Sequence, residues 1–248
     1  MRILFDDGRH KNVVYEDLCE GQMVQANQHL IVADGEALIL DPGGHKIYTK
    51  LMGGMAVHAS PSRLKHLFFS HQDPDIIAAA NGWLMMTDAM AHLPAIWMRF
   101  LPHFGVDDLV LKRVRPIPDA GESLTLGSAT LKLIPCHFLH SPGNFQVWDP
   151  VAKILYSGDM GASLGMPYAD VPDFDAHIQY MDGFHRRYMP SNSVLRAWAK
   201  MARSLDPEII APQHGAAMRG KPIVGKFIDW IAQLPCGPDY IQNNFVVP

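Results

Sequence analysis

The chain has 248 residues, of which 48% are hydrophobic and 19% are charged, so it can build a large core and sits at the upper size limit for one domain. Its net charge of −4 provides no basic patch, and no apolar run approaches the roughly 18 residues of a membrane span, so we expect neither nucleic-acid nor membrane binding. Three cysteines form no CxxC pair, and Met1–Asp7 lacks the form of a signal peptide, so we expect a cytoplasmic protein.

The first half of the chain mixes short strands with helices. Apolar or β-branched runs predict strands at residues 13–15, 29–32 and 37–40, and residues 33–36 have the composition of a hairpin turn. Helical spacing follows over residues 45–58. An apolar run over 66–69 predicts a buried strand, and residues 76–90 are predicted to be helical. Residues 95–104 then hold a dense apolar cluster that ends at Gly105.

The second half repeats this order. Residues 110–157 are β-rich, with alternation over 122–134 and two short runs joined by a turn at 149–152. An irregular loop over 160–176 is followed by an amphipathic helix over 192–204, a short strand over 208–211 and a last helix over 221–234. Strands then helices, twice and without a linker, predict one α/β (α+β) domain over residues 1–248, with two sheets inside and helices outside.

Chemically active side chains concentrate where the strand over 66–69 ends. The sequence there reads Ser70-His71-Gln72-Asp73-Pro74-Asp75. Asp73 can cap the helix that follows, and Pro74 suits its first position. Open α/β folds bind ligands at such strand ends. A histidine and two carboxylates at alternate positions need a counter-charge, which a metal ion supplies.

Three further strands end in the same way. His140 follows an apolar run and precedes Ser141-Pro142-Gly143, Asp159 follows Ser157-Gly158, and His214 lies within Pro212-Gln213-His214-Gly215. One such residue is usually part of a turn. Four strand ends that each present a potential ligand predict a shared metal site.

As a set, these segments resemble the metallo-β-lactamase superfamily, whose motif HxHxDH is followed by separate His, Asp and His ligands. Within it, the chain is similar to the diiron domain of flavodiiron proteins, where the motif reads HxExD. The segment Asn27-Gln28-His29-Leu30-Ile31 before the hairpin also matches the superfamily. The resemblance covers nearly the whole chain and implies an αββα sandwich of two mixed sheets flanked by helices.

The resemblance implies two metal ions and no catalytic residue beyond their ligands. One metal would be held by His71, Asp73 and His140, the other by Asp75 and His214, and Asp159 would bridge them. Because oxygen donors replace a histidine of the hydrolases, we expect two iron ions, with zinc or manganese as alternatives. The small-molecule ligand would be O₂ or NO.

Two positions depart from the family pattern. Ile76 stands where the wider superfamily often has a histidine for the second metal. His92 or His103 could fill that gap, although both suit a plain surface or core histidine. Asp73 is one methylene shorter than the usual Glu and binds directly or through a water. His137, three residues before His140, is expected to be a neighbour of the site and not a ligand.

The chain ends at Pro248 without the flavodoxin domain of flavodiiron proteins, which resembles stand-alone oxygen-binding diiron proteins. We therefore expect an oxygen sensor or scavenger, with O₂ or NO reduction if a separate protein donates electrons. The resemblance also implies a homodimer and a redox or signalling partner. The alternative is a dizinc hydrolase of the same fold. A metal-free structural member is disfavoured, because buried carboxylates without counter-charge would be costly.

Overall fold

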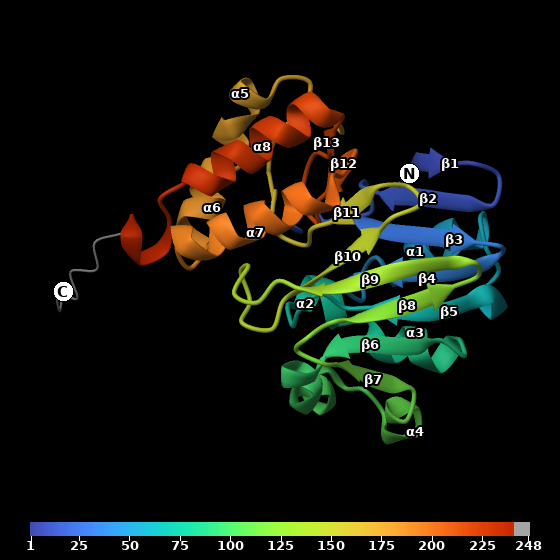
Figure 1. Cartoon of the computed structure of the whole chain (residues 1–248). Helices are drawn as coiled ribbons and strands as arrows, with labels where there is room; N and C mark the ends of the chain where they lie inside the picture. Colours follow the sequence, from blue (N-terminus) through green and yellow to red (C-terminus); the bar gives the residue numbers. More distant parts are fainter. Residues whose placement is uncertain (241–248) are drawn as a thin grey trace.

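The computed structural model describes residues 1–240, and its strands form two sheets that pack face to face between two layers of helices (Figure 1). The first sheet has seven strands in the order β1-β2-β3-β4-β5-β6-β7. Strands β1 to β4 pair antiparallel, and β4 to β7 pair parallel. These strands are β1 (Arg2–Asp6), β2 (His10–Tyr15), β3 (Gln28–Ala33), β4 (Glu36–Leu40), β5 (Leu64–Phe68), β6 (Met90–Pro94) and β7 (Val114–Ile117).

The second sheet has six strands in the order β13-β12-β11-β10-β9-β8. All its neighbours pair antiparallel except β11 and β12, which are parallel. The strands are β8 (Glu122–Leu126), β9 (Ala129–Pro135), β10 (Phe145–Asp149), β11 (Ile154–Tyr156), β12 (Ile209–Ala211) and β13 (Met218–Arg219). Both sheets are therefore mixed.

Helices cover the outer face of each sheet. Figure 1 shows the blue-to-green helices beside the first sheet and the orange-to-red helices beside the second. The first group is α1 (Tyr48–Ala56), η1 (Pro61–Arg63), α2 (Pro74–Ile77), α3 (Ala80–Met86), η2 (Ala95–Phe104) and α4 (Asp108–Leu111). The second group is α5 (Phe174–His177), η3 (Ile178–Tyr180), α6 (Asp182–Tyr188), α7 (Asn192–Leu205), α8 (Lys221–Gln233) and η4 (Gly237–Asp239).

Strand β4 shows how the sequence produces this layering. Its side chains alternate between the two faces of the sheet, as the pleat requires. Ala37 and Ile39 join the apolar cluster beneath α1 and α3, whereas Leu38 and Leu40 join the cluster between the sheets. Because both faces are buried, the strand is apolar throughout. The predicted sandwich of two mixed sheets flanked by helices is confirmed.

The helix predicted over residues 76–90 is wrong in extent. Helix α2 ends at Ile77, α3 ends at Met86, and Met90 begins strand β6. Thr87 is already extended and its hydroxyl donates to Trp83 O at 2.7 Å. Pairing of β6 with β5 and β7 then decides the backbone of the following residues. Long-range strand pairing overrode local helix preference here.

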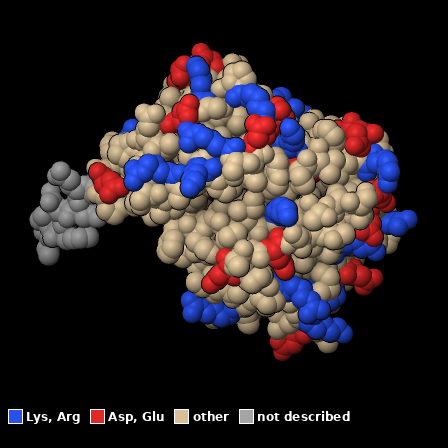
Figure 2. Space-filling view, viewed as in Figure 1, with Lys and Arg blue, Asp and Glu red and all other residues tan. Residues whose placement is uncertain are grey.

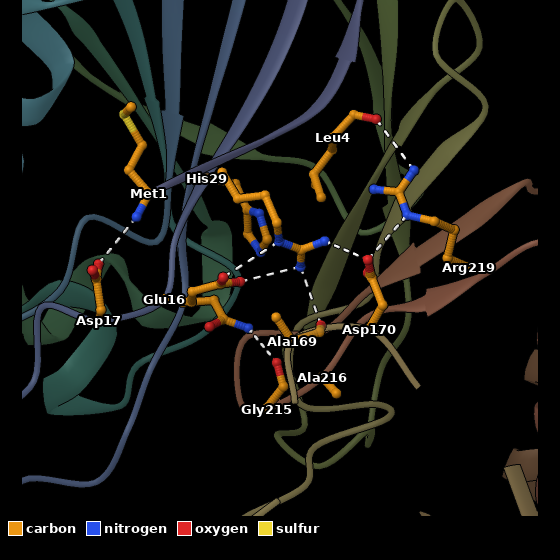
Figure 3. A network of polar contacts seen from close by, with 12 residues as sticks. Met1, Leu4, Glu16, Asp17, His29, Ala169, Asp170, Gly215, Ala216 and Arg219 are labelled. Carbon is orange, nitrogen blue, oxygen red and sulfur yellow. Dashed lines mark hydrogen bonds and ion pairs between the residues drawn. The ribbon is translucent and has the colours of Figure 1, made fainter. Parts of the chain in front are cut away.

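A polar network joins the free edges of the two sheets (Figure 3). The Arg2 guanidinium on β1 donates to Asp170 at 2.7 Å, to Glu16 at 3.1 Å and to the carbonyl of Ala169 at 3.1 Å. Arg219 on β13 pairs with Asp170 at 3.4 Å. Asp170 therefore ties the loop after Asp159 to the first and last strands.

Charged side chains of both signs are interspersed over the helices on the face shown in Figure 2, and an uncharged area lies between them at the level of the β9–β10 loop. Among the described residues, no helix combines the length and apolar character that crossing a membrane requires.

Candidate metal centre

Six ligand-type side chains converge at one end of the sandwich, and each follows the end of a strand. His71, Asp73 and Asp75 come from the junction of β5 and α2. His140 comes from the β9–β10 loop, Asp159 follows β11, and His214 follows β12. The two sheets meet here, since Phe145 N donates to Ser70 O at 3.0 Å. The convergence therefore follows from the packing of the sheets.

The first half of the centre comprises His71, Asp73 and His140. His71 Nε2 lies 3.5 Å from Asp73 Oδ2, and His140 Nε2 lies 3.6 Å from the same oxygen. Asp159 Oδ2 completes the group, 3.7 Å from His71 Nε2 and 2.6 Å from His140 Nε2. One donor atom from each of these four residues lies within 4.8 Å of the others.

The second half comprises Asp75 and His214. His214 Nε2 lies 3.4 Å from Asp75 Oδ2 and 3.6 Å from Asp159 Oδ1. Asp159 thus turns one carboxylate oxygen toward each half of the centre. Asp159 is only 3% exposed, so both contacts are made by a nearly buried carboxylate.

Local structure aims Asp73 at the imidazoles. Asp73 occupies the N-cap position of α2 with Pro74 next, as the sequence suggests, but its side chain makes no capping hydrogen bond. Instead Gln72 Nε2 donates to Asp73 Oδ1 at 2.9 Å, which leaves Oδ2 facing His71 and His140. The Ser141 hydroxyl donates to Gln72 Oε1 at 2.7 Å, so the β5–α2 junction and the β9–β10 loop hold each other in place.

Two of the histidines are oriented through their second ring nitrogen. His71 Nδ1 lies 2.9 Å from Ser70 Oγ. His214 Nδ1 donates to the carbonyl of Gln25 at 2.6 Å, because a carbonyl only accepts. In both rings Nε2 is the atom that faces the carboxylates, as in a metal-binding histidine whose other nitrogen is held by the protein.

The charges of the centre depend on one another. Burial lowers the pKa of His71, but Asp73 and Asp159 outweigh it and raise that pKa to about 9. Burial also disfavours the Asp159 carboxylate, yet His140, His71 and His214 hold its pKa well below the usual range. Burial and the charge of Asp159 raise the pKa of Asp75, although His214 opposes this. A proton on His71 thus provides part of the positive charge that the neighbouring carboxylates need.

These residues fit a pair of metal ions. The buried atoms His71 Nε2 and Asp159 Oδ1 have no hydrogen-bond partner among residues 1–240. Five of the six donor separations, 3.4–3.7 Å, match two ligands bound to one ion at about 2.1 Å each. The sixth, 2.6 Å between His140 Nε2 and Asp159 Oδ2, is that of a direct hydrogen bond in the metal-free centre. Mixed imidazole and carboxylate donors suit iron, manganese or zinc. Replacing imidazole protons by metal ions would satisfy both orphaned atoms.

A cavity of about 810 Å³ opens above the centre. Asp73, Asp75, His140, Asp159 and His214 line its floor. Apolar and aromatic side chains form its walls, among them Met23, Val24, Ile47, Leu164, Phe184 and Tyr188. Phe184 and Tyr188 stack with ring centroids 4.7 Å apart, and both rings contact His140 edge-on.

Helix α6, which carries Phe184 and Tyr188, escaped the sequence prediction. Its seven residues are too few for a periodic apolar pattern to stand out. The only local signal is the spacing of four between the two aromatic residues, which places them on one face of a helix. Gln28 and Cys19 also line the cavity and were not predicted as site residues.

Neither histidine considered for the gap at Ile76 reaches the centre. Ile76 is fully buried in the apolar cluster beneath the first sheet. His92 lies on β6, with Nε2 3.1 Å from His66 Nδ1, and His103 is an exposed residue of η2. His137 lies beside His140 in sequence but contacts the carbonyl of Asp119 at 3.2 Å. The second half therefore has fewer nitrogen donors than the first.

A family model and two solved structures match most of the chain. A family model described as ODP family beta lactamase matches residues 24–215. A solved structure of the peroxy diiron species of the chemotaxis sensor ODP is 39% identical, with a TM-score of 0.90 over 99% of this chain and 100% of that chain. The apo state of the chemotaxis sensor ODP from T. denticola is 38% identical, with a TM-score of 0.88 over 98% of each chain.

A curated relative also matches. Rubredoxin-oxygen oxidoreductase of Megalodesulfovibrio gigas is 22% identical over 224 residues, which is 83% of this chain and 53% of that protein. This chain spans about half the length of the curated relatives from Megalodesulfovibrio gigas and Methanocaldococcus jannaschii.

Proposed function

Because this chain belongs to the family described as ODP family beta lactamase, we propose that it is a diiron protein that binds O₂ and acts as an oxygen sensor or scavenger. The observation that carries the proposal is the position of Asp159, whose two oxygens face two separate groups of ligand-type side chains. The similarity to a diiron sensor over the whole chain supports iron as the metal.

In this proposal His71, Asp73 and His140 would hold the first metal, Asp75 and His214 would hold the second, and Asp159 would serve both. When bound, two ferrous ions supply the electrons and open coordination positions for a small molecule such as O₂ or NO. The three carboxylates neutralise most of the positive charge of the ions. The Ser70 hydroxyl and the Gln25 carbonyl keep His71 and His214 turned toward the metals.

Iron fits this set of donors better than zinc. The hydrolases of the superfamily use more imidazoles, whereas this centre pairs three histidines with three carboxylates. Harder oxygen donors favour iron or manganese. We therefore take the likeness to lactamases as a likeness of fold. Finding a dizinc hydrolase would contradict the proposal.

The sensing role rests on the comparison that covers both chains fully, since that protein is a chemotaxis sensor. Transmission of the signal requires a separate signalling protein. Reduction of O₂, which the name of the rubredoxin-oxygen oxidoreductase implies for that relative, or reduction of NO would require a separate electron donor. We treat residues 1–248 as one domain in either role.

A homodimer is part of the proposal. Three apolar side chains that line the cavity are also exposed, namely Val24, Leu164 and Tyr188. Exposed apolar side chains that cluster in this way mark protein interfaces. A cytoplasmic location is supported by Cys19, Cys136 and Cys236, which are all free thiols.

The test is metal analysis of anaerobically purified protein followed by admission of O₂. We expect about two irons per chain and an absorption band that appears only with O₂. Two zinc ions together with hydrolysis of an ester or lactam would refute the proposal. Light scattering at micromolar concentration tests the dimer, and a monomer would remove that part alone.

A further inference from the structure

Gln28 is a buried amide that the metal centre described so far does not use. It is the first residue of β3 and has no exposed surface. Neither its Nε2 nor its Oε1 has a hydrogen-bond partner within residues 1–240. Its side chain lines the same cavity as Asp75 and His214. Burying an amide without partners is unfavourable, so the arrangement indicates that a bound group interacts with it.

The backbone that leads to Gln28 is fixed against the loop of His214. The Gln25 carbonyl accepts from His214 Nδ1 at 2.6 Å. Asn27 N donates to Gln213 O at 2.5 Å, and the Asn27 side chain donates to Pro212 O and Gly215 O at 2.9 Å each. The hydrogen bonds of Gln25 and Asn27 therefore hold the backbone just before Gln28 against the segment that contains His214.

The side chain of Gln28 meets the turn that contacts the Asp75 segment. A Cβ placed on Gly43 would lie 3.5 Å from Gln28 Nε2. Gly43 N donates to Ile76 O at 3.1 Å, and a Cβ placed on Gly44 would lie 3.7 Å from Pro74 O. The amide thus lies beside the Gly43 turn, which contacts the residues on either side of Asp75, and it lines the same cavity as Asp75 and His214.

We propose that the side-chain oxygen of Gln28 is a further ligand of the second metal ion, in the place that Ile76 leaves without a donor. This inference rests on the proposed diiron function. A neutral amide oxygen is a hard donor that suits ferrous or manganous ions. It adds no negative charge to a centre that already holds three carboxylates, and it makes the second position weaker than an imidazole would.

Cys19 is the competing candidate, because it lines the same cavity. Burial raises the pKa of its thiol, and a protonated thiol is a poor ligand. The two residues can be separated by substitution. Gln28→Leu keeps the volume of the side chain and removes its oxygen, Gln28→Glu replaces the amide by a carboxylate, and Cys19→Ala is the control.

The experiment titrates full-length, metal-free protein with ferrous iron under anaerobic conditions against a chelator, so that two binding steps are resolved. Gln28→Leu should weaken the second step about tenfold or more, the range found when groups that support a metal are removed, and leave the first step unchanged. Gln28→Glu should tighten the second step, and Cys19→Ala should match the wild type.

Folding is checked with the metal-free proteins. Since Gln28→Leu removes a buried amide without partners, its melting temperature should equal or exceed that of the wild type, while the rise produced by excess ferrous iron should be smaller. The inference is overturned if Gln28→Leu binds both irons as tightly as the wild type, or if it loses both binding steps equally. Either result leaves the proposed function standing. Loss of the second step in Cys19→Ala also overturns it. A wild type that takes up fewer than two irons refutes the proposed function itself, and the inference with it.

Discussion

Replacing Asp159 with Asn tests whether a single carboxylate serves both halves of the metal centre. Asp159 Oδ2 lies 2.6 Å from His140 Nε2, and Oδ1 lies 3.6 Å from His214 Nε2. The substitution keeps the shape of the side chain but removes its charge and replaces one oxygen by an amide nitrogen. We therefore expect the variant to lose affinity for both metals.

The size of the effect follows from the charge and its burial. Two unit charges about 4 Å apart interact by about 4 kcal/mol at an effective dielectric constant of about 20. Asp159 is only 3% exposed, so solvent screening does not reduce this value much further. About 4 kcal/mol corresponds to about a thousandfold in a dissociation constant. We therefore expect a loss of affinity on the order of a thousandfold per metal.

The assay is an anaerobic ferrous titration with chelator competition, followed by metal analysis of the desalted protein. Asp119→Asn is the matched control, because it makes the same change of net charge at an exposed residue. The Asp159→Asn protein should retain no iron after desalting, whereas the control should retain about two per chain. Retention of one iron by Asp159→Asn would show that the carboxylate serves only one half.

Three other predictions follow from separate parts of the structure. His140→Ala should remove most of the bound metal and His137→Ala almost none, since His140 faces Asp159 at 2.6 Å whereas His137 contacts a backbone carbonyl; equal metal loss in both variants would show that the ligand is misassigned. Gly143→Ala should lower the free energy of unfolding by about 1–3 kcal/mol in chemical denaturation, because its Cβ would lie 2.2 Å from a side-chain atom of Ile96. Gly53→Ala in α1, where a Cβ meets nothing within 4 Å, should instead stabilise the protein, and the same sign for both glycine variants would contradict the packing described. Burial lowers the pKa of His29, His92, His177 and His185 to about 4, so the unfolded state binds more protons between pH 6.5 and 4 and the metal-free protein should lose stability as the pH falls through that window; a melting temperature that does not fall there would contradict the burial of these four imidazoles in the neutral form.

The positions of the candidate ligands could be predicted from the sequence because each follows a short apolar strand and precedes a turn. That pattern is local and can be read without knowledge of the fold. His71, Asp159 and His214 all follow it, and the structure places their side chains at one end of the sandwich. Which sheet each strand joins is decided by long-range pairing and could not be read from the same pattern.

The parts that escaped prediction depend on contacts between distant residues. Thr87, Asp88, Ala89 and Met90 follow helix α3 without a glycine or proline that would end it, and pairing with β5 and β7 makes the strand β6 that starts at Met90. Gln28 reads as a polar residue at the start of a strand. The proposal for Gln28 depends on its place in the cavity beside the Gly43 turn, which local sequence does not indicate.

The volume of the cavity bears on how a small gas molecule would reach the ligand-type side chains on its floor. Its volume of about 810 Å³ is more than twenty times the share of a single water molecule, about 30 Å³. Entry of a diatomic molecule therefore needs no fluctuation that opens a packed tunnel. If bond formation at the metal centre is slower than diffusional encounter, the uptake rate should depend little on the viscosity of the solvent.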